Sequence, residues 1–343
     1  MPISDKLNLP EFTDIYNQSH VTLTPNTFNQ PNTILITGAQ GMLGHGLAVA
    51  INELQKLDPS NKPRLFLASR TWQDKSSSIW KDTLNCELIT NEQIPFISQK
   101  IDLVVHAASP SNVTQISSFE ELAWANLGIL RSILDICPRK IVYISSGEVY
   151  GGGQTHEEMP FKGFSKSNVR DWYPIVKLAA EKELRLFQMD HELEVCVIRL
   201  FHTFGPGVKT DDGRSFADVL WGATKKKEIV LKSKGEQVRT FLYLSDAVDG
   251  VLSLAFNRLL GFSVINLGST TPTSILEFAK IVANISGATV KFDFADAFQH
   301  SPNKTIVPNV DRMIQNGWNQ KTTLEEGVRR TINWIKNSTL AQS

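Results

Sequence analysis

The chain has 343 residues, which at roughly 150 residues per domain is enough for about two domains. It carries 35 lysines and arginines against 35 aspartates and glutamates, and this zero net charge argues against nucleic acid as the main partner. Hydrophobic residues make up 41%, and no apolar run approaches the roughly 20 residues of a membrane span, so we expect a globular protein with no membrane partner.

The cysteines and the first residues bear on the location of the protein. Cys86, Cys137 and Cys196 are widely spaced and odd in number, so they predict neither a disulfide framework nor a metal site. The first residues show no basic region followed by an apolar stretch, so no secretory signal is expected. Both observations favour reduced thiols and a cytoplasmic protein.

Residues 1–32 are polar and contain several prolines, and we interpret them as an N-terminal extension. Short apolar runs then alternate with helical apolar spacing up to about residue 200. This alternation predicts an α/β fold of the Rossmann type, in which a parallel sheet is doubly wound. The predicted strands are 34–36, 65–68, 101–106, 140–145 and 195–199, and the predicted helices are 42–57, 119–137 and 171–190.

After Phe201 the pattern is less regular, and Gly205-Pro206-Gly207 interrupts it. We interpret this part as a smaller domain that interleaves with the first and covers the carboxyl edge of the sheet, where ligands bind in open α/β folds. Helices are expected near 216–224, 274–285 and 323–336, and strands near 229–231, 239–243 and 263–267, the last of which could rejoin the main sheet.

Three glycines follow the first predicted strand in the pattern Gly-x-x-Gly-x-x-Gly. The first permits a tight turn, the second lets backbone amides approach a pyrophosphate, and the third allows close helix–strand packing. The start of the next helix adds unpaired amide donors and partial positive charge. The motif predicts a dinucleotide site formed by Gly38, Gln40, Gly41, Met42, Leu43 and Gly44.

The end of the second predicted strand bears on the choice of cofactor. A carboxylate at this point binds the ribose hydroxyls of NAD, whereas an arginine pairs with the additional phosphate of NADP. This sequence has Ser69 and Arg70 there, which slightly favours NADP over NAD. The alternative is that Arg70 stacks on adenine and leaves the choice open.

Small residues follow the strand 101–106. Ala107, Ala108 and Ser109 would let a dinucleotide lie across this edge, and His106 before them is interpreted as a packed core histidine. Asn126 interrupts the apolar face of the next predicted helix. It would either fix a water or backbone group behind a catalytic lysine or be exposed at the surface.

Tyr173 and Lys177 are four residues apart and therefore lie on one face of a predicted helix. A lysine beside a tyrosine, with a positive nicotinamide nearby, favours the phenolate. Tyr173 could then remove the proton of a sugar hydroxyl while hydride leaves for nicotinamide. Ser146, after the strand 140–145, would hydrogen-bond the same oxygen.

The segments Gly38–Gly44, His106–Ser109, Ser145–Gly151 and Tyr173–Lys177 together resemble the extended short-chain dehydrogenase/reductase family. More narrowly, they are similar to its NAD(P)-dependent nucleotide-sugar epimerase, dehydratase and decarboxylase branch, which includes the UDP-glucuronate decarboxylases. The resemblance implies a nucleotide-diphosphate sugar as ligand, a role in polysaccharide or glycolipid precursor synthesis, and a homodimer.

The pattern of strands and helices along the chain gives the domain division. We expect a Rossmann domain over 33–204 that binds NAD(P) and also receives about 245–268, and a mainly substrate-binding, interleaved domain over 205–343.

The resemblance also implies roles for three residues of the second half. Arg239 would contact the substrate pyrophosphate, the stretch around His202 would lie between nicotinamide and sugar, and Arg214 would bind substrate. The alternative for Arg239 is an exposed strand arginine. His202 stands where the family often has asparagine, and Gly207 stands where the decarboxylases often have arginine.

Members of this branch begin by oxidising carbon 4 of the sugar. Glu148 lies two residues after Ser146, where dehydratases and decarboxylases keep a glutamate that could remove the carbon 5 proton; alternatively, it braces the loop. Gly147 stands where the thymidine-diphosphoglucose dehydratases have an aspartate that acts as an acid. The GDP-mannose dehydratases lack this aspartate, so dehydration stays open. We therefore expect a 4,6-dehydratase or decarboxylase-like enzyme. The alternatives are a 4-epimerase, an NADPH-dependent 4-keto-sugar reductase and an inactive NADP-sensing regulator.

Overall fold

The structure is a computed structural model, and it describes most of the chain after residue 30. The predicted extension, apart from its last two residues, therefore lies outside the described part. No helix of the described part is both long and apolar enough to cross a bilayer. The described residues are 31–57, 62–72, 84–110, 116, 118–151, 169–259, 261–294 and 307–340.

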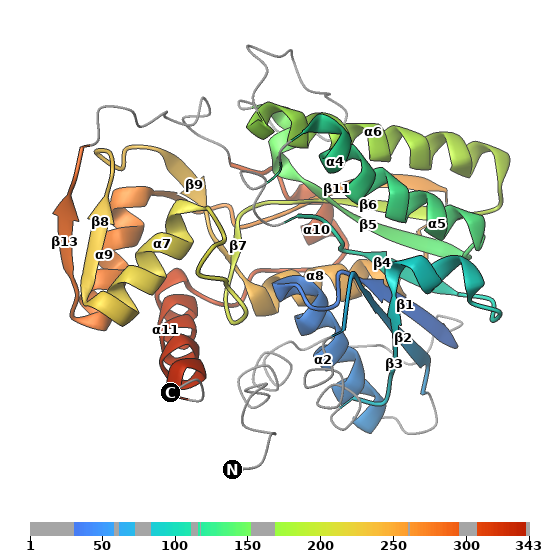
Figure 1. Cartoon of the computed structure of the whole chain (residues 1–343), viewed down its shortest axis with the longest axis horizontal. Coiled ribbons are helices and arrows are strands. Elements are labelled where there is room, and N and C mark those ends of the chain that lie inside the picture. The colour runs from blue at the N-terminus through green and yellow to red at the C-terminus, as the bar shows by residue number, and fades with distance from the viewer. Residues whose placement is uncertain are drawn as a thin grey trace.

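A parallel sheet forms the larger lobe (Figure 1), and within the described residues it has seven strands in the order β11-β6-β5-β4-β1-β2-β3. The strand order reverses between β1 and β4, so the carboxyl ends of these two strands form the crevice where open α/β sheets bind ligands. The strands are β1 (Thr33–Thr37), β2 (Arg64–Ser69), β3 (Glu87–Thr90), β4 (Leu103–His106), β5 (Lys140–Ser146), β6 (Glu194–Leu200) and β11 (Phe262–Leu267). The predicted Rossmann-type sheet is confirmed.

Helices cover both faces of this sheet because its strands are apolar on both sides. In β1, Ile34 and Ile36 enter the core on one face, while Leu35 enters the core on the other. The first face is covered by α2 (Met42–Leu57) and α8 (Leu244–Phe256). The second face is covered by α4 (Phe119–Ala123), α5 (Ile129–Asp135) and α6 (Val169–Asp190).

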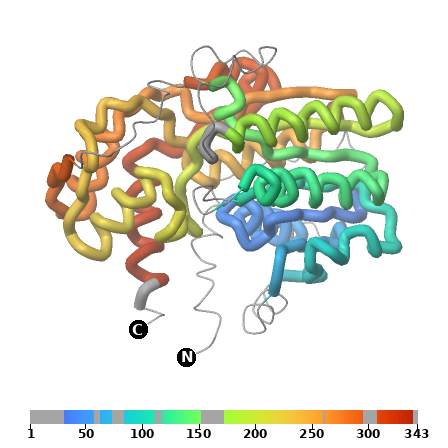
Figure 2. Tube along the Cα trace, turned by 45° about the horizontal axis from the view of Figure 1, so that its top comes forward, coloured from blue at the N-terminus to red at the C-terminus, as the bar shows by residue number. Residues whose placement is uncertain are grey.

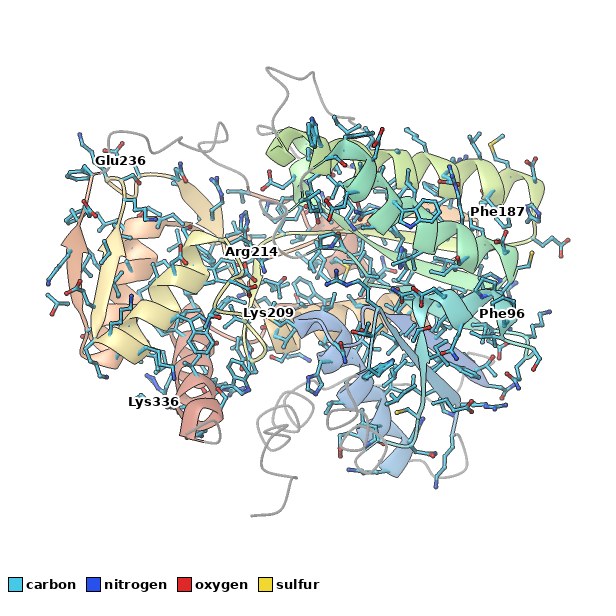
Figure 3. The ribbon with its side chains drawn as sticks, in the orientation of Figure 1. Phe96, Phe187, Lys209, Arg214, Glu236 and Lys336 are labelled. Atoms are coloured by element: carbon cyan, nitrogen blue, oxygen red, sulfur yellow. The ribbon has the colours of Figure 1, made fainter. Side chains whose placement is uncertain are left out.

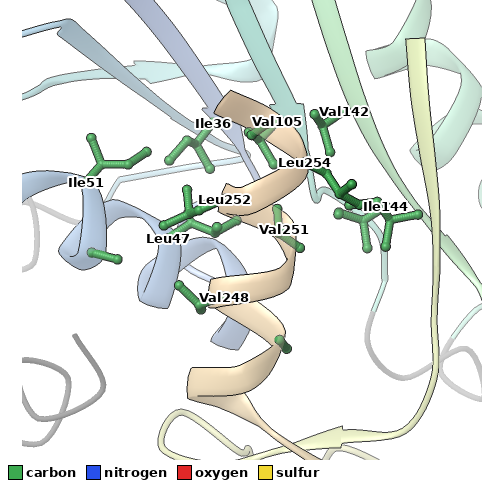
Figure 4. Packing of buried hydrophobic residues seen from close by; sticks show 14 of the residues in the cluster. Ile36, Leu47, Ile51, Val105, Val142, Ile144, Val248, Val251, Leu252 and Leu254 are labelled. Atoms are coloured by element: carbon green, nitrogen blue, oxygen red, sulfur yellow. The ribbon is translucent and has the colours of Figure 1, made fainter. Parts of the chain in front are cut away.

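Figure 4 shows how α2 and α8 meet each other beneath the sheet. Their aliphatic side chains interlock with those of the central strands and are almost entirely removed from water, and each such burial contributes about 1.5–3 kcal/mol. The side chains labelled there are Ile36, Leu47, Ile51, Val105, Val142, Ile144, Val248, Val251, Leu252 and Leu254.

The smaller lobe lies to one side of the parallel sheet in both views (Figures 1 and 2), and it has its own aromatic core. The rings of Phe241 and Phe278 stack with centroids 4.4 Å apart, and Phe204 meets both rings edge-on. The helices of the second half besides α8 are α7 (Ser215–Trp221), α9 (Ile275–Ser286), α10 (Asp311–Gln315) and α11 (Leu324–Leu340).

Short strand pairs complete the second half. Strands β7 and β10 pair in parallel, β8 and β13 in parallel, and β9 and β12 antiparallel. Their bounds are β7 (Thr203–Phe204), β8 (Glu228–Leu231), β9 (Val238–Thr240), β10 (Leu242–Tyr243), β12 (Pro272–Ser274) and β13 (Thr289–Phe292).

Several predicted elements differ from the structure. The single strand predicted over 239–243 is wrong: β9 pairs with β12 up to Thr240, and Leu242 then donates to the His202 carbonyl oxygen beside β7. The helix predicted over 119–137 ends at Asp135 and widens into a π turn over 124–128. Strands β3, β7, β12 and β13 were not predicted. The predicted strand 263–267 pairs with β6, as expected.

Candidate active site

The glycine loop joins the end of β1 to the start of α2 and leaves no room for side chains. Gly38 has a φ of +70°, and a Cβ atom there would lie 2.7 Å from the backbone nitrogen of Ala108. A Cβ atom on Gly44 would lie 2.3 Å from the carbonyl oxygen of Gly38. The loop is therefore packed too tightly for any residue but glycine at these two positions. Such a glycine loop before a helix fits the close approach of a pyrophosphate to the amides that begin α2.

The end of β2 forms the adjacent part of this loop. The Ser69 hydroxyl donates to the side-chain oxygen of Gln40 at 2.9 Å, so β2 is tied to the glycine loop. Arg70 follows and is exposed. Met42 and Leu43 are half-buried beneath the loop. The end of β2 fits the ribose of the adenosine half of a dinucleotide bound at the glycine loop.

The end of β4 is held by buried polar groups. The Thr37 hydroxyl and His106 Nδ1 share a 2.6 Å hydrogen bond, which confirms the interpretation of His106 as a packed core histidine. Ser109 donates to Asn126 Oδ1 at 3.0 Å, and Asn126 donates to the Leu122 carbonyl oxygen at 2.9 Å. Asn126 is 1% exposed, so the alternative of a surface asparagine is wrong.

The hydroxyl of Tyr173, on α6, meets the end of β5. Burial raises the pKa of Tyr173, whereas hydrogen bonds with the Ser109 and Ser146 hydroxyls and the charge of Arg214 lower it. Ser146 also accepts a hydrogen bond from the Glu148 backbone amide at 3.2 Å, which fixes the turn after β5. Tyr173 and Ser146 can therefore hydrogen-bond one oxygen of a ligand together.

Lys177 lies one turn further along α6 and is 2% exposed. Its ammonium donates to the Ile144 carbonyl oxygen at 3.0 Å and lies 5.8 Å from the centre of the Tyr173 ring. Burial lowers the pKa of Lys177 to about 7, and the nearby Glu181 carboxylate opposes this effect. The spacing of four thus brings Lys177 beneath Tyr173, as predicted.

Charged residues from the second half of the chain converge on the same place. Figure 3 shows Arg214 where the two lobes meet, and its guanidinium forms a bidentate ion pair with Asp212, one bond of which is 2.7 Å long. Arg239 is 6% exposed, so the alternative of a surface arginine is wrong. Burial lowers the pKa of Arg239, and the charge of Glu148 opposes this.

His202 is close enough to both arginines for their charges to act on it. Burial, followed by the charges of Arg239 and Arg214, lowers its pKa to about 3. Its Nδ1 atom is buried and has no hydrogen-bond partner among the described residues. A neutral imidazole flanked by two guanidinium groups is an environment suited to an anionic ligand.

The catalytic and substrate candidates predicted from the sequence thus meet at one edge of the sheet, with the predicted cofactor loop beside them. Sequence reasoning missed the buried polar residues behind this edge. Glu181 continues the spacing of four from Tyr173 and Lys177, and this is the signal that could have revealed it. The other missed residues are Ser145, Arg199 and Asp212.

Comparison with known proteins assigns the family. The model of the NAD dependent epimerase/dehydratase family matches residues 34–268. The chain belongs to this family and is therefore an enzyme of the NAD-dependent epimerase/dehydratase class. This agrees with the resemblance found from the sequence motifs.

The individual relatives share about a quarter of their residues with this chain. UDP-glucuronic acid decarboxylase 1 of Xenopus tropicalis is 26% identical over 314 residues, covering 88% of this chain and 72% of that protein. UDP-glucuronic acid decarboxylase 3 of Arabidopsis thaliana is 26% identical over 315 residues, covering 89% of this chain and 90% of that protein.

Solved structures share the fold. The UDP-glucuronic acid 4-epimerase of Bacillus cereus, in complex with UDP-glucuronic acid and NAD, has a TM-score of 0.75 at 21% identity, covering 89% of this chain and 99% of that chain. MoeE5 in complex with UDP-glucose and NAD has a TM-score of 0.74 at 23% identity, covering 90% and 99%.

Proposed function

We propose that this enzyme oxidises carbon 4 of a UDP-hexuronate and then releases the carbon 6 carboxyl group as CO2. The observation that carries the proposal is the convergence on the Tyr173 hydroxyl of Ser146, Glu148 and Arg214. The decarboxylases among the relatives support the choice of a hexuronate.

The chain's own residues would carry the first step. Tyr173 takes the proton of the carbon 4 hydroxyl, and Ser146 holds the same oxygen. Lys177 beneath the ring favours the phenolate electrostatically. Bound NAD or NADP supplies the hydride acceptor and donor for this chemistry. The residues assigned to the cofactor are Gly38, Gln40, Gly41, Met42, Leu43, Gly44, Arg70, Ala107, Ala108, Ser109, Asn126, Tyr173 and Lys177.

Oxidation at carbon 4 makes loss of CO2 possible, because the carboxylate is then β to a ketone. The bond between carbons 5 and 6 breaks, its electron pair moves toward the ketone oxygen, and carbon 5 takes up a proton. We assign this proton transfer to Glu148. Arg239 and Arg214 bind the anionic groups of the substrate, and the neutral His202 offers them a hydrogen bond.

Dehydration is less well supported than decarboxylation. The dehydratases with an aspartate before the glutamate use that aspartate as an acid, and this chain has Gly147 there. A Cβ atom on Gly147 would lie 2.6 Å from the ring of Phe201, so a longer side chain does not fit this backbone. The acid for removal of a carbon 6 hydroxyl is therefore missing from this position.

One observation favours 4-epimerisation as a second candidate. Gly207, where the decarboxylases often have arginine, has a φ of +90°, and a Cβ atom there would lie 3.3 Å from Met42 Cα. Where that arginine is needed for decarboxylation, an enzyme without it keeps the carboxyl group. Hydride can then return to carbon 4 of the ketone from either face, which gives either carbon 4 epimer.

Three further proposals concern cofactor, assembly and location. We propose that Arg70 gives a preference for NADP over NAD. We propose a homodimer through the outer side of α6 and of the π turn that follows α4, because three large apolar side chains are exposed there: Trp124 of the turn by 77%, and Leu186 and Met189 of α6 by 65% and 68%. The three free cysteines support a reducing cytoplasmic location.

A panel of nucleotide sugars, analysed by mass spectrometry with and without added NADPH, tests the function. Conversion of UDP-glucuronate to a UDP-pentose with release of CO2 is the expected result. Conversion to UDP-galacturonate without loss of mass would select the epimerase. A stoichiometric requirement for NADPH with a 4-keto sugar would select a reductase and contradict both proposals.

A further inference from the structure

A buried carboxylate lies directly behind the active site and takes no part in the proposed chemistry. Glu181 is 3% exposed and lies one helical turn after Lys177 on α6. It accepts a hydrogen bond from the Ser145 hydroxyl at 2.5 Å and from Nη2 of Arg199 at 2.7 Å. The Glu181 carboxylate therefore joins α6 to two strands. Its contact on β5 is Ser145, the residue before Ser146, and its contact on β6 is Arg199.

The hydrogen-bond network extends from Arg199 to the turn that carries Glu148. The Arg199 guanidinium lies 4.8 Å from the centre of the Tyr150 ring, and Tyr150 ends this turn. The Tyr150 hydroxyl donates to Asn266 Oδ1 at 2.7 Å, which anchors the turn to β11. The network thus contacts each segment that carries a catalytic candidate.

Such a pair is weak as a stabilising device. Removing two charges from water costs several kcal/mol per ion, and well-packed apolar residues of similar volume are often as stable. The pair also has an effect beyond stability, because the charge of Glu181 acts on the ammonium of Lys177.

The surroundings of Lys177 offer little other compensation for its charge. Its ammonium meets the Ile144 carbonyl oxygen and the ring of Tyr143, whose centre is 5.0 Å away. The centre of the Tyr173 ring is 5.8 Å from the ammonium, and His106 is close enough for the charge of Lys177 to act on it. Burial removes nearly all water.

We propose that Glu181 is a positioning residue of this active site, which with Arg199 holds α6 against β5 so that Lys177 lies as an ammonium beneath Tyr173 and Ser146. The expected effect of Glu181 on turnover rests on the proposed function. The expected effect of Glu181 on the protonation of Lys177 does not depend on that function.

Two variants and a control test this role. Glu181→Gln removes the charge and keeps the shape, but leaves Arg199 buried without its counter-ion. The double variant Glu181→Leu with Arg199→Met removes both charges. Asp249→Asn is the control, because it breaks an ion pair with Lys321 (3.1 Å) that also buries its carboxylate but lies away from the site.

Three quantities are measured: the thermal midpoint of unfolding, the dependence of kcat on pH, and the titration of Lys177. The Lys177 titration is followed by carbon-13 NMR of the lysine ε-carbons, and its signal is assigned with the variant Lys177→Arg. We expect Glu181→Gln to lower the thermal midpoint and the double variant to recover it. In both variants kcat at neutral pH should fall at least about tenfold, with a smaller change in KM. The alkaline limb of kcat and the Lys177 titration should move about one pH unit lower. Asp249→Asn should move neither pH profile.

The proposal is overturned if the double variant regains kcat and the wild-type pH profile together with its thermal midpoint, because Glu181 would then serve the fold alone. An unchanged Lys177 titration in Glu181→Gln, measured below its thermal midpoint, overturns it as well. If the wild-type enzyme oxidises no nucleotide sugar, the proposed function fails, and the NMR titration alone decides the role of Glu181.

Discussion

The ammonium of Lys177 donates to the carbonyl oxygen of Ile144 at 3.0 Å, so the lysine is held by the strand that also carries Ser146. This contact fixes the charge below the Tyr173 ring at the cost of nearly complete burial. Burial thereby lowers the pKa of Lys177 to about 7, so the charge of this lysine changes near neutral pH.

The stability of the protein should therefore depend on pH through Lys177. Its folded pKa of about 7 lies below the ordinary lysine value of 10.5, so the unfolded chain binds more protons between these values. Below pH 7 the folded protein carries the full free-energy cost of burying the Lys177 charge. This cost is relieved as the pH rises toward 10.5, so the free energy of unfolding increases. Relative to Lys177→Met, the wild-type protein should gain stability over this range.

Chemical denaturation at mildly acidic and alkaline pH measures this difference. Lys182→Met, at an exposed position of the same helix, is the matched control and should show no such trend. A Lys177→Met difference that stays constant with pH would mean that Lys177 keeps its charge in the folded protein.

Tyr173→Phe should reduce turnover by about 10²- to 10⁴-fold, because it removes the group assigned to take the substrate proton. Dinucleotide binding should change little, since the ring and its contact with Lys177 remain. Single-turnover formation of reduced nicotinamide and a cofactor titration by fluorescence measure the two effects. Wild-type turnover in this variant would remove Tyr173 from the mechanism.

The sheet and most of the site were accessible from the sequence because their signals are local. The glycine loop stands between a strand and a helix, and Tyr173 and Lys177 share one helix face by spacing alone. Strands β3 and β13 escaped prediction because they are short edge strands, and β7 and β12 because they have two or three residues and depend on tertiary pairing.

The buried ion pair escaped for a different reason. Glu181 and Arg199 lie 18 residues apart on different elements, and only the packing of α6 on β6 brings them together. Their residue types alone are those of a solvent-exposed pair. For Asn126 and Arg239 the sequence left open whether each residue is buried in the site or exposed at the surface. The reason is the same, since burial of a polar residue is decided by tertiary structure.

Glu148→Gln should separate the two halves of the proposed reaction. Oxidation at carbon 4 depends on Tyr173 and should persist, so reduced nicotinamide should accumulate, whereas proton transfer at carbon 5 should slow by about 10²-fold or more. Rapid mixing followed by mass spectrometry detects the unreleased 4-keto intermediate. An unchanged rate and product profile would remove Glu148 from the proton transfer and leave it with a bracing role in its turn.

Gly44→Ala should abolish dinucleotide binding and destabilise the fold. The added Cβ would meet the Gly38 carbonyl oxygen at 2.3 Å, and because this neighbour is backbone the glycine loop itself must move. Gly128→Ala is the control, since its Cβ would meet only the Trp124 ring at an ordinary 3.4 Å. Cofactor titration and thermal unfolding of both variants test this prediction. Retained cofactor binding in Gly44→Ala would show that the loop backbone can move to make room for the added carbon.

Arg70→Ala tests the cofactor preference. Arg70 is exposed at the end of β2, and a guanidinium there can form charge-assisted bonds with the 2′-phosphate of NADP that NAD lacks. Loss of such bonds is worth about 1.5–3 kcal/mol, so NADP affinity should fall by about tenfold or more while NAD affinity changes little. The control is Arg64→Ala, at the opposite end of the same strand, which should leave both affinities unchanged. Equal losses for NAD and NADP would instead indicate that Arg70 stacks on adenine, because that contact is common to the two cofactors.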